Sequence, residues 1–181
     1  MKEDLDDFQR GLLLRLMRID LQIEEPAELE DKLRQILNVC PELPLMIEAQ
    51  YQDTENHVII YESCWIYCNL SMIDDQDIHE LFLNPEFSPI KFLSVNLYSE
   101  NVVVKSTAFQ AIGNYLGSEL LWRKTIELSN LGDHILKLTT GEEKNVKLKV
   151  LRQVLFCVSN IFSYYSEFKD DEDIKFLSSC L

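Results

Sequence analysis

A short phrase recurs three times along this chain, each time as an Asn within an apolar stretch that reads as a helix. The three asparagines are Asn69, Asn114 and Asn160, so successive copies lie 45 and 46 residues apart. A larger side chain stands four residues before each Asn: Trp65, Gln110 and Phe156. A period of this size is typical of helical solenoids, whose units bury their apolar faces only by stacking on neighbours. The sequence therefore predicts an all-α fold whose function is binding.

The predicted helices follow one another in the order short, short, long. Long helices are expected at residues 58–72, 102–116 and 146–165. This order is the layout of an armadillo unit, and two-helix HEAT repeats are the nearest alternative. We therefore expect a single right-handed superhelix of about four units without any sheet. The approximate units are 1–50 (a helical cap and a partial repeat), 51–98, 99–141 and 142–181.

The first predicted helix, residues 8–23, carries an apolar residue at every helical turn. Phe8, Leu12, Leu16, Ile19 and Ile23 share one face at this spacing. Further along, Gly132 is expected to form the corner between two shorter helices.

The charge balance excludes several classes of partner. Lys and Arg number 17 against 31 for Asp and Glu, which gives a formal net charge of −14. Such a surface repels nucleic acid and anionic lipid and favours basic partners. No apolar run is long enough to span a bilayer, so membrane insertion is not expected.

The cysteines indicate a reducing compartment. They are five in number, scattered, and mostly flanked by apolar residues, and the chain does not start with a secretory signal. We therefore expect free thiols and a cytoplasmic or nuclear location.

No residue pattern predicts catalysis, a cofactor or a metal. Cys64 and Cys68 lie one helical turn apart with His57 nearby, so a Cys/His metal-binding protein is a remote alternative. A structural zinc site usually has a Cys-x-x-Cys knuckle and a second ligand pair, and the sequence has neither. Small residues at helix contacts are the favoured interpretation of these cysteines. The chain also lacks a phosphate-binding glycine loop, a Gly-x-Ser-x-Gly elbow and a His-Glu-x-x-His motif.

The repeated phrases resemble those of the armadillo repeats of importin α, the adaptor for nuclear import. Residues 107–117 contain Ala-Ile-Gly-Asn, residues 151–161 end in Ser-Asn-Ile, and residues 63–70 contain Cys-Trp, all as in that family. The resemblance covers residues 58–181 well and 27–57 loosely. It implies a groove along the third helix of each unit, in which Asn holds the backbone of an extended basic peptide and Trp stacks on its Lys and Arg side chains.

The resemblance gives six candidate partner-binding residues and one candidate rim. The expected concave-face residues are Trp65, Asn69, Gln110, Asn114, Phe156 and Asn160. The expected acidic rim is Asp74, Asp75 and Asp77. The alternative is structural: each Asn braces a neighbouring helix, and Trp65 and Phe156 pack in the core.

Two functional interpretations follow. The first is a non-enzymatic adaptor or scaffold subunit of a larger assembly, and the alternative is an import-adaptor relative that binds basic nuclear-localisation peptides. The first 25 residues lack the Lys/Arg-rich arm of importin α, and only Trp65 keeps the family's Trp, so the scaffold interpretation is preferred.

Overall fold

The computed structural model describes residues 5–51, 54–73, 75–83, 89–119, 121–140 and 146–165. Within these ranges the chain forms ten helices and no strand, so the all-helical prediction is confirmed. None of the helices in these ranges is both long enough and apolar enough to cross a membrane. The chain divides into two compact units, residues 1–89 and residues 90–181.

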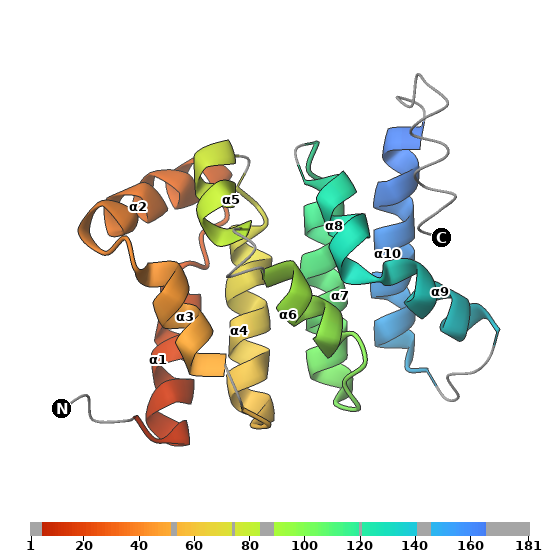
Figure 1. The fold of residues 1–181 in the computed structure, drawn as a ribbon, viewed down its shortest axis with the longest axis horizontal. Coiled ribbons are helices and arrows are strands. Elements are labelled where there is room, and N and C mark those ends of the chain that lie inside the picture. The colour runs from red at the N-terminus through yellow and green to blue at the C-terminus, as the bar shows by residue number, and fades with distance from the viewer. Residues whose placement is uncertain are drawn as a thin grey trace. The chain divides into compact units, whose positions relative to one another are not determined.

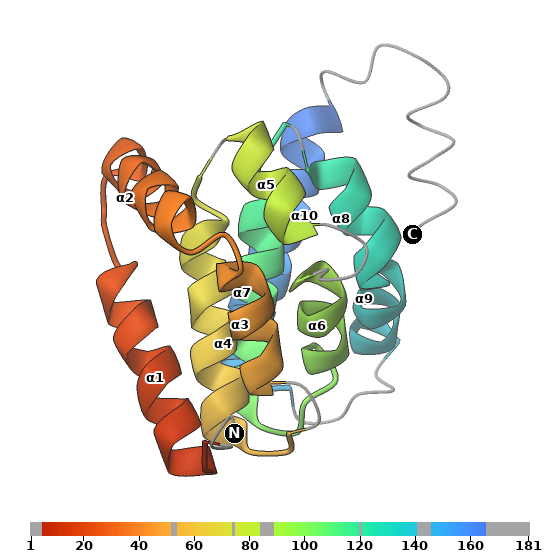
Figure 2. The ribbon, with the colours of Figure 1, turned by 60° about the vertical axis from the view of Figure 1, so that its left-hand side comes forward.

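The first unit is built on two long parallel helices, α1 and α4. Its helices are α1 (Asp7–Asp20), α2 (Pro26–Val39), α3 (Leu43–Tyr51), α4 (His57–Leu70) and α5 (Gln76–Leu83). Helices α1 and α4 lie side by side (Figures 1 and 2). Asn56, just before α4, contacts Asp7 at the start of α1, whereas Asn69 near the end of α4 contacts Arg18 near the end of α1. The two helices therefore run in the same direction.

The second unit repeats this parallel pairing with α7 and α10. Its helices are α6 (Pro89–Asn96), α7 (Val102–Leu116), α8 (Trp122–Ser129), α9 (Leu131–Thr139) and α10 (Leu148–Tyr165). The Cys157 thiol lies 3.2 Å from the Phe109 carbonyl, and the Asn160 amide lies 2.7 Å from the Gly113 carbonyl. Both contacts advance along α7 and α10 together, so these helices are also parallel.

Side-chain caps begin α1, α4 and α7. Asp6 accepts a hydrogen bond from the Gln9 N–H at 2.8 Å, and the Gln9 side chain accepts one from the Asp6 N–H. Asn56 and Asn101 accept from backbone N–H groups at the starts of α4 and α7. These caps satisfy donors that the first helical turn leaves without partners.

The first predicted helix is present, but its apolar stripe faces solvent. The buried positions of α1 are Gly11 and Leu14, whereas Phe8 is 78 % exposed and Leu16 57 % exposed. Helix α1 therefore packs with the face opposite to that stripe.

The predicted corner at Gly132 is wrong by two residues. Gly132 lies inside α9 and is buried, and the chain turns instead at Asn130, whose φ is 49°. Asn tolerates this left-handed conformation better than most residues because its short polar side chain bonds locally.

Candidate functional site

Asn69 braces α4 against the preceding long helix. Its side chain is 8 % exposed, and its amide Nδ2 donates to the Arg18 carbonyl at 3.3 Å. The Gln22 N–H bonds to Ile19 instead, so this carbonyl lacks the usual donor four residues on. Asn69 thus supplies a donor to one of the carbonyls that the end of α1 leaves unpaired.

Asn160 occupies the same place in the second unit. Its Nδ2 donates to the Gly113 carbonyl at 2.7 Å, in the last turn of α7. That carbonyl also accepts from the Gly117 N–H at 3.1 Å. Asn69 and Asn160 therefore make the helix-bracing contacts that the sequence offered as the alternative to peptide binding. Peptide binding by the repeated asparagines stays a prediction. Asn114 lies half-buried near the end of α7.

The three larger residues of the repeated phrases are partly accessible. Trp65 is half-buried and meets Tyr61 edge to face, with ring centroids 6.4 Å apart. Its indole Nε1 is enclosed and has no hydrogen-bond partner within the described residues. Gln110 is half-buried. Phe156 is 37 % exposed, and its ring covers Gly113 so closely that a Cβ there would lie 2.5 Å from Cδ1.

The predicted acidic rim has one structurally engaged member. Asp75 pairs with Arg34, and its other oxygen accepts from the Ile78 N–H at 2.8 Å, which caps α5. Asp77 lies exposed in the first turn of α5, and Asp74 lies outside the described residues. Asp75 therefore serves local structure, and Asp77 remains available to a partner.

The cysteines and His57 do not come together as a ligand set. Cys64 and Cys68 are buried within α4, whereas His57 is exposed at its first residue. Burial raises the pKa of the Cys64 thiol, and burial likewise raises that of Cys157, which keeps both protonated. No cluster of three or more His, Cys, Asp or Glu side chains suited to a metal occurs in the described ranges.

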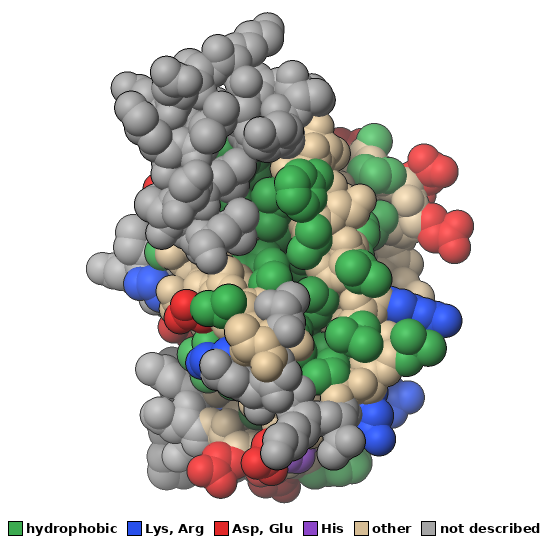
Figure 3. All heavy atoms as spheres, turned by 90° about the vertical axis from the view of Figure 1, so that its right-hand side faces the viewer, with side chains coloured by type: hydrophobic (Ala, Val, Ile, Leu, Met, Phe, Trp, Pro, Cys, Tyr) green, Lys and Arg blue, Asp and Glu red, His purple; other side chains and the backbone are tan. Residues whose placement is uncertain are grey.

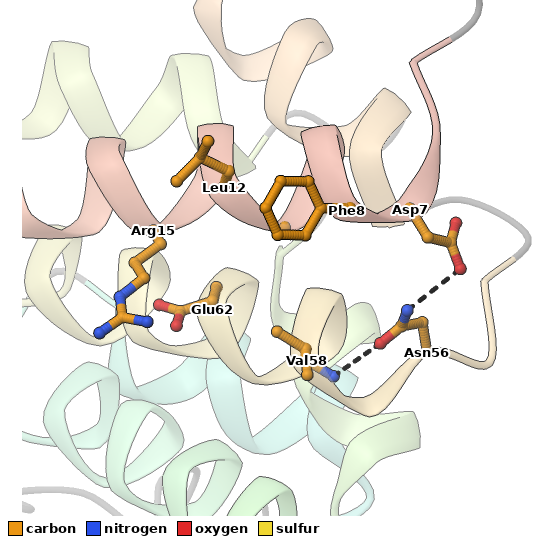
Figure 4. Close-up of a pocket in the computed structure, with 8 residues that line it drawn as sticks. Asp7, Phe8, Leu12, Arg15, Asn56, Val58 and Glu62 are labelled. Carbon is orange, nitrogen blue, oxygen red and sulfur yellow. Dashed lines mark hydrogen bonds between the residues drawn. The ribbon is translucent and has the colours of Figure 1, made fainter.

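The structure contains a groove that the repeated phrases do not indicate. A hollow of about 350 Å³ lies between α1 and α4 (Figure 4). Phe8, Leu12 and Val58 form its apolar part, above Gly11. Gly11 leaves unfilled space at the base of the groove, because a Cβ there would meet only Val58 Cγ1 at 3.7 Å.

Polar groups close both ends of this groove. At one end the Asn56 amide donates to Asp7 at 3.1 Å. At the other end lies Glu62, which is 5 % exposed and bound by Arg18 with 2.5 Å between Nε and Oε2. Arg15 reaches over the same end, is exposed, and forms no ion pair with another described residue. The groove therefore has an apolar centre between polar ends.

The sequence did carry a signal for this surface. The spacing of Phe8, Leu12, Leu16 and Ile19 marks one helix face, and the structure leaves all four exposed. What the sequence does not show is that α1 buries Gly11 and Leu14 instead, so that these four larger apolar residues stay exposed.

Comparisons with protein-family models, with curated proteins and with solved structures find no match to this chain. Its resemblance to importin α therefore remains a prediction from the sequence.

Proposed function

We propose that this chain is a non-enzymatic protein-interaction module, an adaptor or scaffold subunit of a larger assembly. In this proposal its helices form about four armadillo-type repeats, and its long helices present the binding surface. Its partner is another protein, either an extended segment or a neighbouring subunit.

The observation that carries the proposal is the exposed apolar face of α1. Phe8, Leu12, Leu16 and Ile19 are all exposed, and the first two line the α1–α4 groove. A contiguous apolar surface of this kind marks interaction sites in soluble proteins. Burying the part of these side chains that is still exposed contributes about 25 cal/mol per Å² of apolar area, which favours a bound state for this face.

The Asn contacts support the repeat part of the proposal. Asn69 and Asn160 stand 91 residues apart and each donates to the last turn of the preceding long helix. Recurrence of one helix–helix contact is the property on which a solenoid is built.

The same contacts favour the scaffold interpretation over the import adaptor. The amides of Asn69 and Asn160 each already donate one hydrogen bond within the fold, which leaves fewer donors for a peptide backbone. Trp65, Gln110 and Phe156 keep partial exposure and remain candidate contacts for a partner.

Affinity capture with quantitative mass spectrometry tests the proposal. We expect the wild-type chain to retain a stoichiometric set of protein partners that a Leu12→Glu, Leu16→Glu variant loses. The matched control is Val39→Glu, Val95→Glu, which adds the same charge at residues 87 % and 72 % exposed outside α1. Equal retention by both variants, or no stoichiometric partner of the wild type, would contradict the proposed function.

A further inference from the structure

The exposed apolar residues of α1 stand at positions equivalent to those through which α4 contacts α1. Helix α4 meets α1 through Val58, Glu62 and Asn69, which approach Gly11 and Arg18. With buried Ile66, these positions are 58, 62, 66 and 69. Subtracting 50 from each gives 8, 12, 16 and 19, the exposed apolar face of α1. On α4, Glu62, Ile66 and Asn69 are buried whereas Val58 is 59 % exposed, so α1 displays at equivalent positions a face that α4 largely buries.

Helix α10 displays the opposite half of the same contact. Its side toward α7 buries Val150, Val154, Cys157 and Ile161. Its other side exposes four apolar side chains: Leu148, Leu151, Leu155 and Phe162. Figure 3 shows hydrophobic side chains gathered on one face of the molecule.

The register of this second face matches that of α7. The 46-residue step from Asn114 to Asn160 places Leu155 at the position of Phe109 and Ser159 at that of Gly113. Phe109 and Gly113 are the residues whose carbonyls receive the Cys157 thiol and the Asn160 amide. A small residue at position 159 preserves the close approach that Gly113 allows, because its side chain adds little bulk.

We infer that a second copy of this chain covers the exposed face: α1 of one copy packs in parallel on α10 of another. This inference rests on the proposed interaction function and names the partner of the α1 face. The contact is the one already made twice within the chain, by α1 with α4 and by α7 with α10, continued between molecules.

The charges at the two helix starts complement each other. Asp6 and Asp7 stand at the start of α1, and Lys147, Lys149 and Arg152 stand at the start of α10. These three cations are exposed and form no ion pair within the described part of the chain. Parallel packing brings the two starts together, so the acidic pair of one copy faces the basic cluster of the next.

Two different faces meet in this contact, so it is heterologous. A heterologous contact does not stop at a dimer unless the rotation closes a ring. The purified chain should therefore show an average mass that rises with concentration beyond twice the monomer mass.

Analytical ultracentrifugation of purified full-length protein at up to about 100 µM tests the inference, since a contact of micromolar Kd is nearly saturated there. The first variant carries Leu12→Glu and Leu16→Glu on α1, and the second carries Leu155→Glu and Phe162→Glu on α10. Each alone should be monomeric, whereas an equimolar mixture should form a 1:1 dimer, because one variant keeps the α10 face and the other keeps the α1 face. Val39→Glu, Val95→Glu should assemble like the wild type.

Three outcomes overturn the inference: a wild type that stays monomeric, an α10 variant that still self-associates alone, or a mixture that yields no dimer. Circular dichroism checks that each variant is folded. If a double variant is not folded, Ile19→Arg is used in place of the α1 variant and Ser159→Arg in place of the α10 variant. Each adds bulk and charge at a single exposed position. A monomeric wild type that still captures other proteins through α1 would refute self-assembly and leave the proposed function standing. Loss of both would refute the two together.

Discussion

Gly113 and Gly11 both lie in long helices at a point where another long helix approaches, but their surroundings differ. A Cβ on Gly113 would lie 2.5 Å from Phe156 Cδ1 and 3.3 Å from the Cys157 sulfur. A Cβ on Gly11 would meet only Val58 at 3.7 Å, an ordinary contact. Gly113 is therefore needed for the approach of α10, whereas Gly11 leaves space in the α1–α4 groove.

We expect Gly113→Ala to destabilise the fold and Gly11→Ala to stabilise it. Overpacking costs about 1–3 kcal/mol, which exceeds the gain of up to about 1 kcal/mol when Ala replaces a helical Gly. Gly11→Ala should keep that gain because its Cβ meets no close neighbour. Chemical denaturation should therefore show a lower free energy of unfolding for Gly113→Ala and a higher one for Gly11→Ala. In a Phe156→Ala background, Gly113→Ala should lose most of its cost. An unchanged cost in that background would mean that the ring does not set the approach.

The buried thiols give a second residue-scale prediction. Cys64 and Cys157 are fully buried, and burial raises the pKa of each, so both lack access and thiolate character. Cys40 is half-buried in the turn before α3. Site-resolved iodoacetamide labelling at neutral pH should modify Cys40 more than about a hundredfold faster than Cys64 or Cys157, since reagent reaches the buried pair only through opening of the fold. Denatured protein should show similar rates at all three, and early labelling of Cys157 in native protein would contradict its packing under α7.

At the scale of helices, two of the three repeated asparagines act as braces between long helices. Asn69 and Asn160 each donate to a carbonyl in the last turn of the preceding long helix. Each bond therefore constrains how far one helix can slide along the other. The bond from Asn160 is shorter and shares its carbonyl with the Gly117 N–H, whereas the carbonyl paired with Asn69 lacks that second donor.

Substitution of these asparagines separates bracing from peptide binding. Asn160→Ala should lower the free energy of unfolding by about 1 kcal/mol, the typical net value of one hydrogen bond. Asn160→Asp should be worse near neutral pH, because a carboxylate has no donor and faces the Gly113 carbonyl oxygen. Acidification below about pH 4 should narrow the gap between the Asp and Ala variants, since a protonated carboxyl can donate again. Equal stability of Asn160→Asp and wild type at neutral pH would favour a solvent-facing role.

Helix periodicity was sufficient to predict the elements but not their faces. The range predicted for the helix at 102–116 agrees with α7, and two of the three repeated asparagines, Asn69 and Asn160, make similar contacts with the last turn of another long helix. The apolar pattern could not show which side of α1 is buried, because both sides are apolar and the small residue Gly11 marks the contact. It also could not show that the Asn amides point to neighbouring carbonyls, since that depends on the distance between helices. The corner at Asn130 was missed because glycine is the commoner left-handed residue, and Gly132 stood two positions away.

At the scale of the whole molecule, the net charge of −14 acts on every contact at once. Within the described ranges, five acidic side chains form ion pairs with Lys or Arg side chains: Asp7, Asp20, Glu30, Glu62 and Asp75. The chain carries 31 acidic residues against 17 Lys and Arg, so most of the excess charge opposes compaction through mutual repulsion.

We therefore expect moderate salt to stabilise the fold. Raising ionic strength from about 0.01 M to about 0.15 M shortens the Debye length from about 30 Å to about 8 Å, which screens repulsion across the surface more than it weakens a buried pair such as Arg18–Glu62. Thermal melts in sodium chloride should show Tm rising steeply at first and then levelling off.

The protein should be held at about 1 µM, because association of copies would itself raise Tm with concentration. Sodium sulfate at matched low ionic strength should give the same rise, whereas a larger rise in sulfate would point to its exclusion from the surface. A Tm that falls with added chloride would mean that surface ion pairs, rather than repulsion, dominate the electrostatics of this chain.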